Sequence, residues 1–343
     1  MRTPAADGLF MPAEWTPHAR TWMAWPCRES LWREHLGAVR EEYAHLARLI
    51  SAFEPVAMVA DPALAREASA LCGPAVQIVP LPQDDSWARD TAPTFVTDGR
   101  GGVAGVAWRF NGWGGIEPTW KEDARMAEAI LSRLSMRAYK APIVFEGGSV
   151  HVDGEGTALV SEQCLLNPNR NPGLSRAEIE ETLRAYLGVR VVVWLGEGLE
   201  NDETSGHVDN LACFARPGVV IALACSDPSD PNHRVLGDNL RRLALARDAR
   251  GRPLTVVTLE QPAPRTDHLG GRMPLSYVNF SFVNGGVVLP AFEDPKDAPA
   301  RETLARLFPN RRVLQAPSLR IALGGGSVHC VTQQQPAGVP LAP

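Results

Sequence analysis

The segment LGGGSVHC near the carboxyl end of the chain places a cysteine, Cys330, just beyond three glycines. Glycines let the backbone approach a ligand closely or turn with a positive φ, and they leave room for a bound molecule. A thiolate attacks electron-poor carbon well even at neutral pH. Cys330 is therefore a candidate nucleophile, although a cysteine without further context is more often a small buried apolar residue.

A second polar segment, SGHVDN, supplies a candidate proton carrier. His207 and Asp209 stand two residues apart, so on a strand both side chains would leave the same face. The carboxylate would raise the pKa of the imidazole so that it starts protonated, or it would hold a cationic substrate. A ladder of polar residues on a surface explains the pair equally well, so both interpretations stay open.

Asp90, in SWARD, and two tryptophans indicate a site for a cation. Trp87 and Trp113 flank polar or glycine-rich segments instead of lying in apolar runs. Aromatic faces attract cations, and a carboxylate can form paired hydrogen bonds with a guanidinium. The alternative is a surface pair of Arg89 with Asp90, which would contribute little energy, and two tryptophans that belong to the core.

The distribution of possible metal ligands argues against a metal or a nucleotide cofactor. Zinc sites usually show paired ligands at short spacing, whereas His329 and Cys330 are adjacent and no second close pair accompanies them or His207. The chain also lacks a GxxxxGK[ST] loop and a GxGxxG motif after a strand. We therefore expect no metal and no cofactor.

The composition is that of an ordinary globular protein, with 343 residues, 45% of them hydrophobic, and a net charge of −5 at pH 7. This balance does not predict binding to nucleic acid. No apolar run reaches the roughly 18 residues that a membrane helix needs, and the first residues lack a secretory signal. The six cysteines form no CxxC pair, so we expect free thiols in the cytoplasm. A homo-oligomer is left open.

Helical and β-branched segments alternate along the chain, which predicts mixed α/β layers. Apolar residues recur at three- and four-residue spacing in five candidate helices, which span 30–53, 120–135, 175–187, 234–248 and 300–308. Apolar runs rich in β-branched residues follow them. After each set of strands come a short polar signature and another apolar run.

The polar signatures repeat at similar distances. Their marker residues stand 56, 61, 72 and 51 positions apart and are Asp90, Glu146, His207, Asn279 and Cys330. Five similar units imply one repeated architecture over 1–343, and around an axis the signatures would meet in one polar centre. A doubly wound sheet whose loops only look alike fits the spacing as well. The Pro- and Gly-rich stretch 262–276 is expected to form a long loop.

Several longer motifs resemble the agmatine deiminases of the guanidino-group-modifying superfamily. In chain order they are MPAEWTPHARTWMAWP, DDSWARDTAPTF, FNGWGG, EGGS, ETSGHVDN, SYVNF and GGGSVHCVTQQQP, spread from residue 11 to 336. Bacterial peptidylarginine deiminases are similar at the WxRD, GHxD and cysteine motifs. Ser327 and Val328 depart from the usual GGGNIHC, and Ser205 stands where relatives often have Asp or Asn. The pattern therefore supports the reaction type more strongly than the substrate.

This resemblance implies a five-bladed α/β propeller, the pentein fold, and a cofactor-free hydrolysis of agmatine to N-carbamoylputrescine and ammonia through an amidino-cysteine intermediate. By motif position, Cys330 would be the nucleophile and His207 the general acid and base. Asp90 and Asp209 would hold the guanidinium. The resemblance also implies four substrate-binding residues, which are Glu203, Trp87, Trp113 and Asn279.

Other functions remain open on the same residues. Deimination of arginine or peptidyl-arginine, or transfer of the amidino group to an amine, would use similar chemistry. An arginine-specific site should carry a cation for the substrate carboxylate, and Arg109 and Arg170 are candidates. A non-catalytic binding module is the alternative from another class, but a degenerate site would be expected to lose some of the Cys, His and Asp residues that are all present here.

Overall fold

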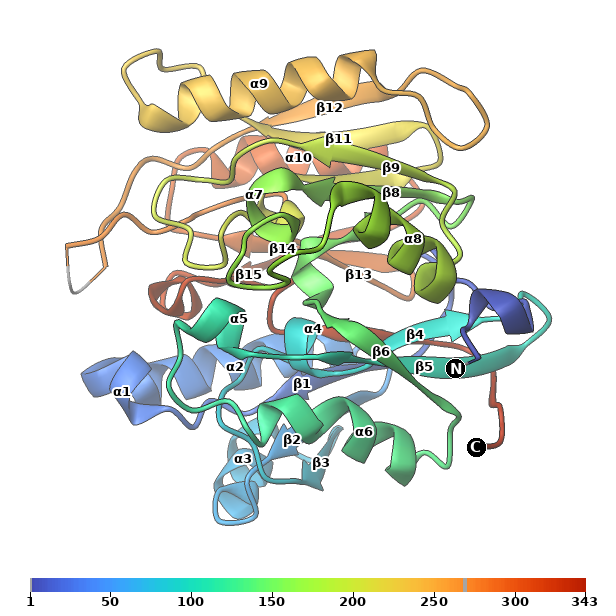
Figure 1. The fold of residues 1–343 in the computed structure, drawn as a ribbon. Helices are drawn as coiled ribbons and strands as arrows, with labels where there is room; N and C mark the ends of the chain where they lie inside the picture. Colours follow the sequence, from blue (N-terminus) through green and yellow to red (C-terminus); the bar gives the residue numbers. More distant parts are fainter. Residues whose placement is uncertain (1, 268–269) are drawn as a thin grey trace.

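The computed structural model describes residues 2–267 and 270–343, and its strands form five small β-sheets (Figure 1). In each sheet the first strand runs antiparallel to the second, and the second runs parallel to the third. A helical crossover joins the second strand to the third, as parallel pairing requires. The sheets and their crossovers are the five repeated units that the sequence predicts.

The first blade takes its strands from both ends of the chain. Strand β16 (Gln333–Pro336) pairs antiparallel with β1 (His18–Ala24), and β2 (Val56–Ala60) and β3 (Val76–Pro80) follow in parallel. Its helices are α1 (Glu29–Trp32), α2 (Leu36–Ser51) and α3 (Ala65–Cys72).

The other four blades follow each other along the chain. The second blade contains α4 (Ala88–Thr91), β4 (Thr94–Thr97), β5 (Gly102–Arg109), α5 (Gly112–Gly115), α6 (Asp123–Arg133), β6 (Ala138–Val144) and the terminal β17 (Val339–Pro340). The third contains β7 (His151–Val152), β8 (Thr157–Ser161), α7 (Glu162–Leu165), α8 (Arg176–Leu187) and β9 (Val191–Leu195). The fourth contains β10 (Ala212–Arg216), β11 (Val219–Ala224), α9 (Pro231–Leu245) and β12 (Thr255–Glu260). The fifth contains β13 (Ser281–Val283), β14 (Gly286–Ala291), α10 (Asp297–Leu307) and β15 (Arg312–Pro317).

Five separate sheets, the first of which is completed by the C-terminal β16, confirm the five-bladed propeller and rule out one doubly wound sheet. The central strands are rich in apolar residues because both of their faces are covered. All five residues of β2 and of β8 are buried. The helix α8 shows how a blade helix is delimited, since Ser175 and Glu178 form a reciprocal capping box and Gly188 ends the helix at φ 68°.

The helix predicted over 30–53 is interrupted, which corrects the sequence interpretation. Arg33 has φ 48°, so α1 ends at Trp32, and a 3-10 turn over Arg33–His35 precedes α2. The break allows the buried Trp32 to stack near Trp87, with ring centroids 5.8 Å apart. The other four predicted helices correspond to α6, α8, α9 and α10 with shifts of a few residues at their ends.

The five polar signatures precede the first strands of the five blades, and hydrogen bonds join neighbouring signatures. The backbone N–H of Gly148 donates to Asp90 over 2.8 Å, and that of Arg89 donates to the Cys330 carbonyl over 3.1 Å. Asn279 links the signatures on either side of it, because its amide donates to Asn210 and its carbonyl accepts the N–H of His329. The marker residues therefore meet at the centre of the propeller.

Two further predictions concern the loop over 262–276 and membrane-spanning helices. Within 262–267 and 270–276 the structure shows one isolated bridge, between Thr266 and Arg272, and no helix or strand, while residues 268 and 269 of the predicted loop lie outside the described residues. Among the described helices, none combines the length and the apolar character that crossing a bilayer requires.

Candidate active site

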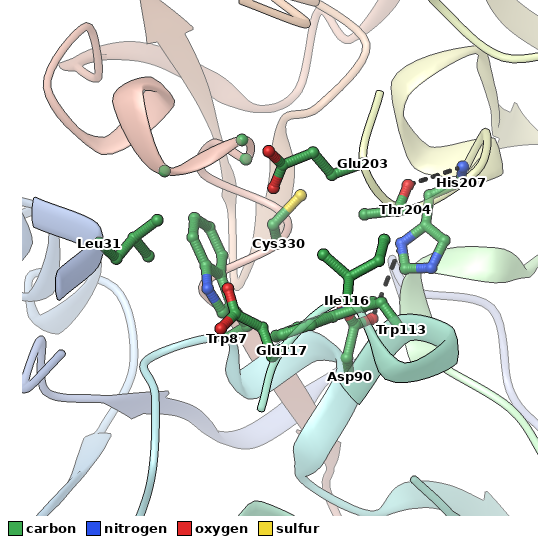
Figure 2. A pocket seen from close by; sticks show the side chains of 13 residues that line it. Leu31, Trp87, Asp90, Trp113, Ile116, Glu117, Glu203, Thr204, His207 and Cys330 are labelled. Carbon is green, nitrogen blue, oxygen red and sulfur yellow. Dashed lines mark hydrogen bonds and ion pairs between the residues drawn. The ribbon is translucent and has the colours of Figure 1, made fainter. Parts of the chain in front are cut away.

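A cavity of about 480 Å³ opens where the signatures meet, and Figure 2 shows Cys330 and Trp87 on one side of it and His207 on the other. This volume includes space that is open to solvent. Six of the eight predicted site residues line the cavity, and they are Trp87, Asp90, Trp113, Glu203, His207 and Cys330. The other two, Asp209 and Asn279, are buried and contact the sulfur of Cys330.

Cys330 is fixed by partners on both its sulfur and its backbone. Asn279 Nδ2 donates to Sγ over 3.1 Å, and Sγ lies 3.5 Å from Asp209 Oδ2. Burial raises the pKa of the thiol well above its usual range, and the charges of Asp209 and Asp90 raise it further. The site without substrate therefore holds a protonated thiol.

The glycines before Cys330 leave the space that the sequence predicts. A Cβ atom on Gly326 would lie 2.4 Å from the ring of Trp87 and 3.1 Å from the sulfur of Cys330. Such a side chain would push the tryptophan and the thiol apart. The glycine run thus lets its backbone pass between the aromatic wall and the nucleophile candidate.

His207 lies between two carboxylates without a short bond to either. Its Nδ1 is 3.9 Å from Asp90 Oδ1 and its Nε2 is 3.5 Å from Glu146 Oε2. Burial lowers the pKa of the imidazole, but Asp90, Cys164 and Glu146 outweigh burial and raise it well above its usual value. His207 is therefore an imidazolium at neutral pH, positioned beside the cavity.

Asp90 stands at the floor of the cavity with one donor on each oxygen. The indole N–H of Trp113 donates to Oδ2 over 2.9 Å, and the Gly148 N–H donates to Oδ1 over 2.8 Å. Trp113 reaches this position from a left-handed backbone conformation with φ 53°. Burial raises the pKa of Asp90, and the nearby Asp209 and Glu146 add to the rise, against the lowering effect of His207.

Asp209 has one engaged and one unengaged oxygen. Oδ2 accepts from His329 Nδ1 over 2.9 Å, whereas Oδ1 is buried and has no hydrogen-bond partner among the described residues. Burial opposes ionisation, but the hydrogen bond and charge of His329 outweigh it and lower the pKa of Asp209. A buried anionic oxygen without a donor is costly, so this atom is suited to receive a donor from a ligand.

The outer part of the cavity is acidic and apolar. Glu203 and Glu117 line it together with Leu31 and Ile116, and no Lys or Arg side chain of the described chain is among its lining residues. Burial raises the pKa of Glu203, and Asp202 and Asp267 contribute. Glu117 pairs with the guanidinium of Arg28. A cationic or dicationic ligand fits these walls better than an anion.

The two arginines considered for a substrate carboxylate do not reach the cavity. Arg109 is exposed and donates to the carbonyl of Pro142 over 3.4 Å. Arg170 is buried, with Nε 3.0 Å from Glu146 Oε1 and Nη2 donating to the Thr204 carbonyl over 2.8 Å. Arg170 therefore fixes Glu146 and the loop before His207, and its use as a carboxylate receptor is not supported.

The sequence interpretation gave no role to Glu146 or Gly148, although both lie in the EGGS signature. A Cβ on Gly148 would lie 2.5 Å from His207 Nδ1, 3.0 Å from Asp209 Oδ2 and 3.1 Å from Asp90 Oδ1. The missing side chain thus lets three polar groups converge. Glu146 is the second of the five marker residues of the sequence, but nothing local indicates what it faces.

Two buried groups combine side chains that are able to ligate metals. Their members are Glu14, His151 and His329 in one group and Glu146, Cys164 and His207 in the other. In the first group the histidines already donate toward the carboxylate of Glu14. The zinc set considered from the sequence is not assembled as one cluster, because His329 faces Asp209 and Glu14 while His207 Nε2 faces Glu146.

A five-bladed propeller with Cys, His and two Asp at its centre defines a guanidino-group-modifying enzyme, and the comparison with known families agrees. The model of the Porphyromonas-type peptidyl-arginine deiminase family matches residues 10–336. The chain belongs to this family.

Several of the matching relatives and solved structures are agmatine deiminases. An agmatine deiminase of Pseudomonas aeruginosa (strain LESB58) is 47% identical, with 98% of this chain and 97% of that protein covered. The agmatine deiminase of Ectopseudomonas mendocina (strain ymp) is 46% identical with the same coverage. The solved structure of the Enterococcus faecalis agmatine deiminase has a TM-score of 0.95 at 35% identity, covering 98% of both chains. The resemblance to the agmatine deiminase family is thereby confirmed.

Proposed function

We propose that the chain hydrolyses agmatine to N-carbamoylputrescine and ammonia through a covalent amidino intermediate on Cys330. One observation carries the proposal: the thiol of Cys330 lies 3.5 Å from Asp209 Oδ2 and lines the same cavity as the His207 imidazolium and Asp90. Nucleophile, proton donor and anionic guanidinium ligands are therefore within one small space, as covalent guanidine chemistry requires.

The first half-reaction forms the intermediate. Asp90 and Asp209 hold the guanidinium by charge-assisted hydrogen bonds and direct its central carbon toward the sulfur. The substrate's positive charge offsets the two carboxylates that raise the pKa of Cys330, so the thiol releases its proton and the thiolate attacks. The neutral tetrahedral adduct receives a proton from His207 on one nitrogen, and ammonia departs, since it is a far better leaving group than amide ion.

The second half-reaction consumes water. Neutral His207 takes a proton from a water molecule, and the resulting hydroxide adds to the amidino carbon. Collapse of this adduct breaks the carbon–sulfur bond, and the hydroxyl proton passes to the sulfur as the urea product forms. Cys330 is again a thiol and His207 again an imidazolium. The proton that the thiol released at the start leaves with ammonia as ammonium.

Substrate preference is assigned from the outer cavity. Glu203 places a carboxylate on the cavity wall, with Trp87 and Trp113 along the passage, while the Glu117 carboxylate is already paired with Arg28. An ammonium group is attracted to Glu203, whereas the carboxylate of arginine would face a like charge. Agmatine deiminase is also the activity in the names of the relatives at 46–47% identity. Asn279 supports the reaction by orienting the sulfur.

We infer that residues 1–343 form one catalytic unit, which works in a reducing, cytoplasmic compartment. The C-terminal β16 pairs with β1 of the first blade, and the terminal β17 pairs with β5 of the second, so the C-terminal segment takes part in two blades. All six cysteines are free thiols, and Cys330 must stay reduced to attack.

The deciding experiment measures ammonia release from agmatine, arginine, and a peptide with an internal arginine, in the presence of a chelator. Release from agmatine alone, abolished in Cys330→Ala, is the expected result, and an acid-quenched sample should show the amidino adduct on Cys330 by mass spectrometry. Release from arginine or the peptide instead would move the substrate. Absence of release from all three would contradict the proposed function.

A further inference from the structure

A chain of buried polar side chains continues from Asp209 into the protein behind the cavity. His329 Nδ1 lies 2.9 Å from Asp209 Oδ2, and His329 Nε2 lies 3.0 Å from Glu14 Oε2. His151 Nε2 approaches the same Glu14 oxygen at 3.3 Å. His329, Glu14 and His151 are each no more than 4% exposed. The chain thus connects the N-terminal segment with the candidate guanidinium ligand.

The partners of the two histidines fix their protonation. His151 Nδ1 accepts the backbone N–H of Phe214 over 3.2 Å, so its proton is on Nε2 and the ring is neutral. His329 has a carboxylate on both nitrogens, so both nitrogens donate and the ring is an imidazolium. Burial and Arg89 lower the pKa of His329, but Glu14 and Asp209 outweigh them and raise it.

We propose that Glu14 is a positioning residue of this site, which acts through His329 to fix the charge and the rotamer of Asp209. The inference rests on the proposed function, in which Asp209 holds the substrate guanidinium. Glu14 keeps the second proton on His329, and the imidazolium then engages Oδ2 of Asp209. The other oxygen, Oδ1, is left without a partner for the incoming donor.

Glu14 is itself held firmly enough for this task. Its Oε1 accepts the backbone N–H of Phe282 over 3.0 Å, so the carboxylate has a donor on each oxygen. The histidine charge and hydrogen bonds outweigh burial and lower its pKa well below the usual value. Glu14 is therefore an anion at neutral pH.

Other charged groups limit the size of the effect. Titratable and charged groups surround each member of the relay. Around Asp209 they are His207, Asp90, Cys330, Arg89, Asp202 and Cys213. Around His329 they are Arg89 and His151, and around Glu14 they are His151, Arg89, Arg311 and Cys213. Arg89 lowers the pKa of Asp209 whether or not Glu14 is charged. Loss of Glu14 should therefore weaken ionisation of Asp209 without abolishing it.

The test is Glu14→Gln, with kcat and KM for agmatine measured across pH. We expect kcat/KM to fall about tenfold to a hundredfold, chiefly through KM. Asp209 must be ionised to bind the guanidinium, and beside a neutral His329 its pKa is higher. The acidic limb of kcat/KM should therefore move to higher pH. Asp248→Asn is the matched control, because this buried carboxylate accepts two backbone N–H groups away from the cavity. It should lower the melting temperature without moving the limb.

A double-mutant cycle separates the relay from general loss of stability. If Glu14 acts through His329, Glu14→Gln adds little to His329→Gln, whereas independent effects would add. Additive losses, or an unmoved acidic limb in Glu14→Gln, would overturn the proposal. If Glu14→Gln does not fold, two other variants test the relay. The acidic limb of kcat/KM should lie at the wild-type pH in Glu14→Asp and at higher pH in His329→Gln. Acidic limbs at the same pH in these two variants would overturn the relay.

A second readout distinguishes failure of the relay from failure of the proposed function. The cationic reagent 2-chloroacetamidine alkylates a cysteine with loss of chloride, and its amidinium needs Asp209 but no turnover. Its rate at Cys330, followed by mass spectrometry, should show the same shift of the acidic limb in Glu14→Gln. A shift in alkylation without any agmatine turnover by the wild type would reject the proposed function and keep the relay. Turnover with no shift in either assay would reject the relay alone.

Discussion

Two buried histidines at the centre of the propeller have similar surroundings and different bonding. His207 and His329 are each faced by two carboxylates, one near each ring nitrogen. Around His329 the nitrogen–oxygen distances are 2.9 and 3.0 Å, and both are hydrogen bonds. Around His207 they are 3.9 and 3.5 Å, and Nε2 has no hydrogen-bond partner within the described residues.

This difference shows how one polar centre can keep a fixed charge beside a transferable proton. Two short charge-assisted bonds hold both protons of His329, so removing either would break a bond in a dry environment. His207 is kept positive by nearby charge without short bonds, so it can give a proton to a substrate atom at lower cost. Consistently, His207 lines the cavity and His329 lies behind it.

The largest effect is expected from Cys330→Ser, which removes the sulfur atom that is the proposed nucleophile. Turnover of agmatine should fall by about 10⁴-fold or more, because a serine hydroxyl in this acidic site does not ionise. Circular dichroism and the thermal midpoint should match the wild type. Substantial residual ammonia release would contradict a covalent route, and with it the difference in task between His207 and His329.

The second-largest effect is expected from His207→Gln, which tests whether His207 supplies the transferable proton. His207→Gln keeps a polar side chain of similar reach without a titrating group, and kcat should fall about 10²- to 10⁴-fold. His233→Gln is the same substitution at a hydrogen-bonded histidine on α9, remote from the cavity, and it should leave kcat unchanged. Retention of kcat in His207→Gln would mean that another group, or water, protonates the leaving nitrogen.

A smaller effect is expected from Gly148→Ala, which disturbs His207 and both aspartates at once. The new methyl group would lie 2.5 Å from His207 Nδ1 and within about 3 Å of Asp209 and Asp90. Displacement of catalytic groups by about 1 Å costs roughly a hundredfold in rate. Gly237→Ala on α9 meets no atom within 4 Å and should retain full activity. Unchanged activity in Gly148→Ala would show that the loosely held His207 tolerates displacement.

Most of the fold could be predicted from the sequence because each blade repeats local patterns. Five helical periodicities and five polar signatures indicate five units. The break at Arg33 could not be read from the apolar spacing over 30–53, because it depends on a positive φ and on Trp32 packing beside Trp87. Tertiary packing decides such positions, whereas periodicity reports only the face of a helix.

Some residues of the candidate site could likewise be predicted from the sequence, and others could not. Cys330, His207 and Asp90 lie in compact motifs, so their residue types and context indicate chemistry. The relay joins Glu14 to His329 across 315 positions, and each residue alone resembles ordinary core or loop chemistry. No spacing rule connects residues that meet only after the propeller closes. Roles that depend on such contacts, including those of Glu146 and Gly148, required the structure.

The smallest expected effect concerns the protonation of the Cys330 thiol. Burial, Asp209 and Asp90 raise the pKa of Cys330 well above its usual range, so the thiolate fraction should rise about tenfold per pH unit throughout the neutral range. Alkylation of Cys330 by neutral iodoacetamide should therefore be slow at pH 7 and still increase beyond pH 9. Peptide mass spectrometry resolves Cys330 from the other five thiols. If the rate instead reached a plateau below pH 8, Cys330 would be a thiolate paired with His207 at rest. The proton of His207 would then be bound as firmly as those of His329, and the contrast between the two histidines would be lost.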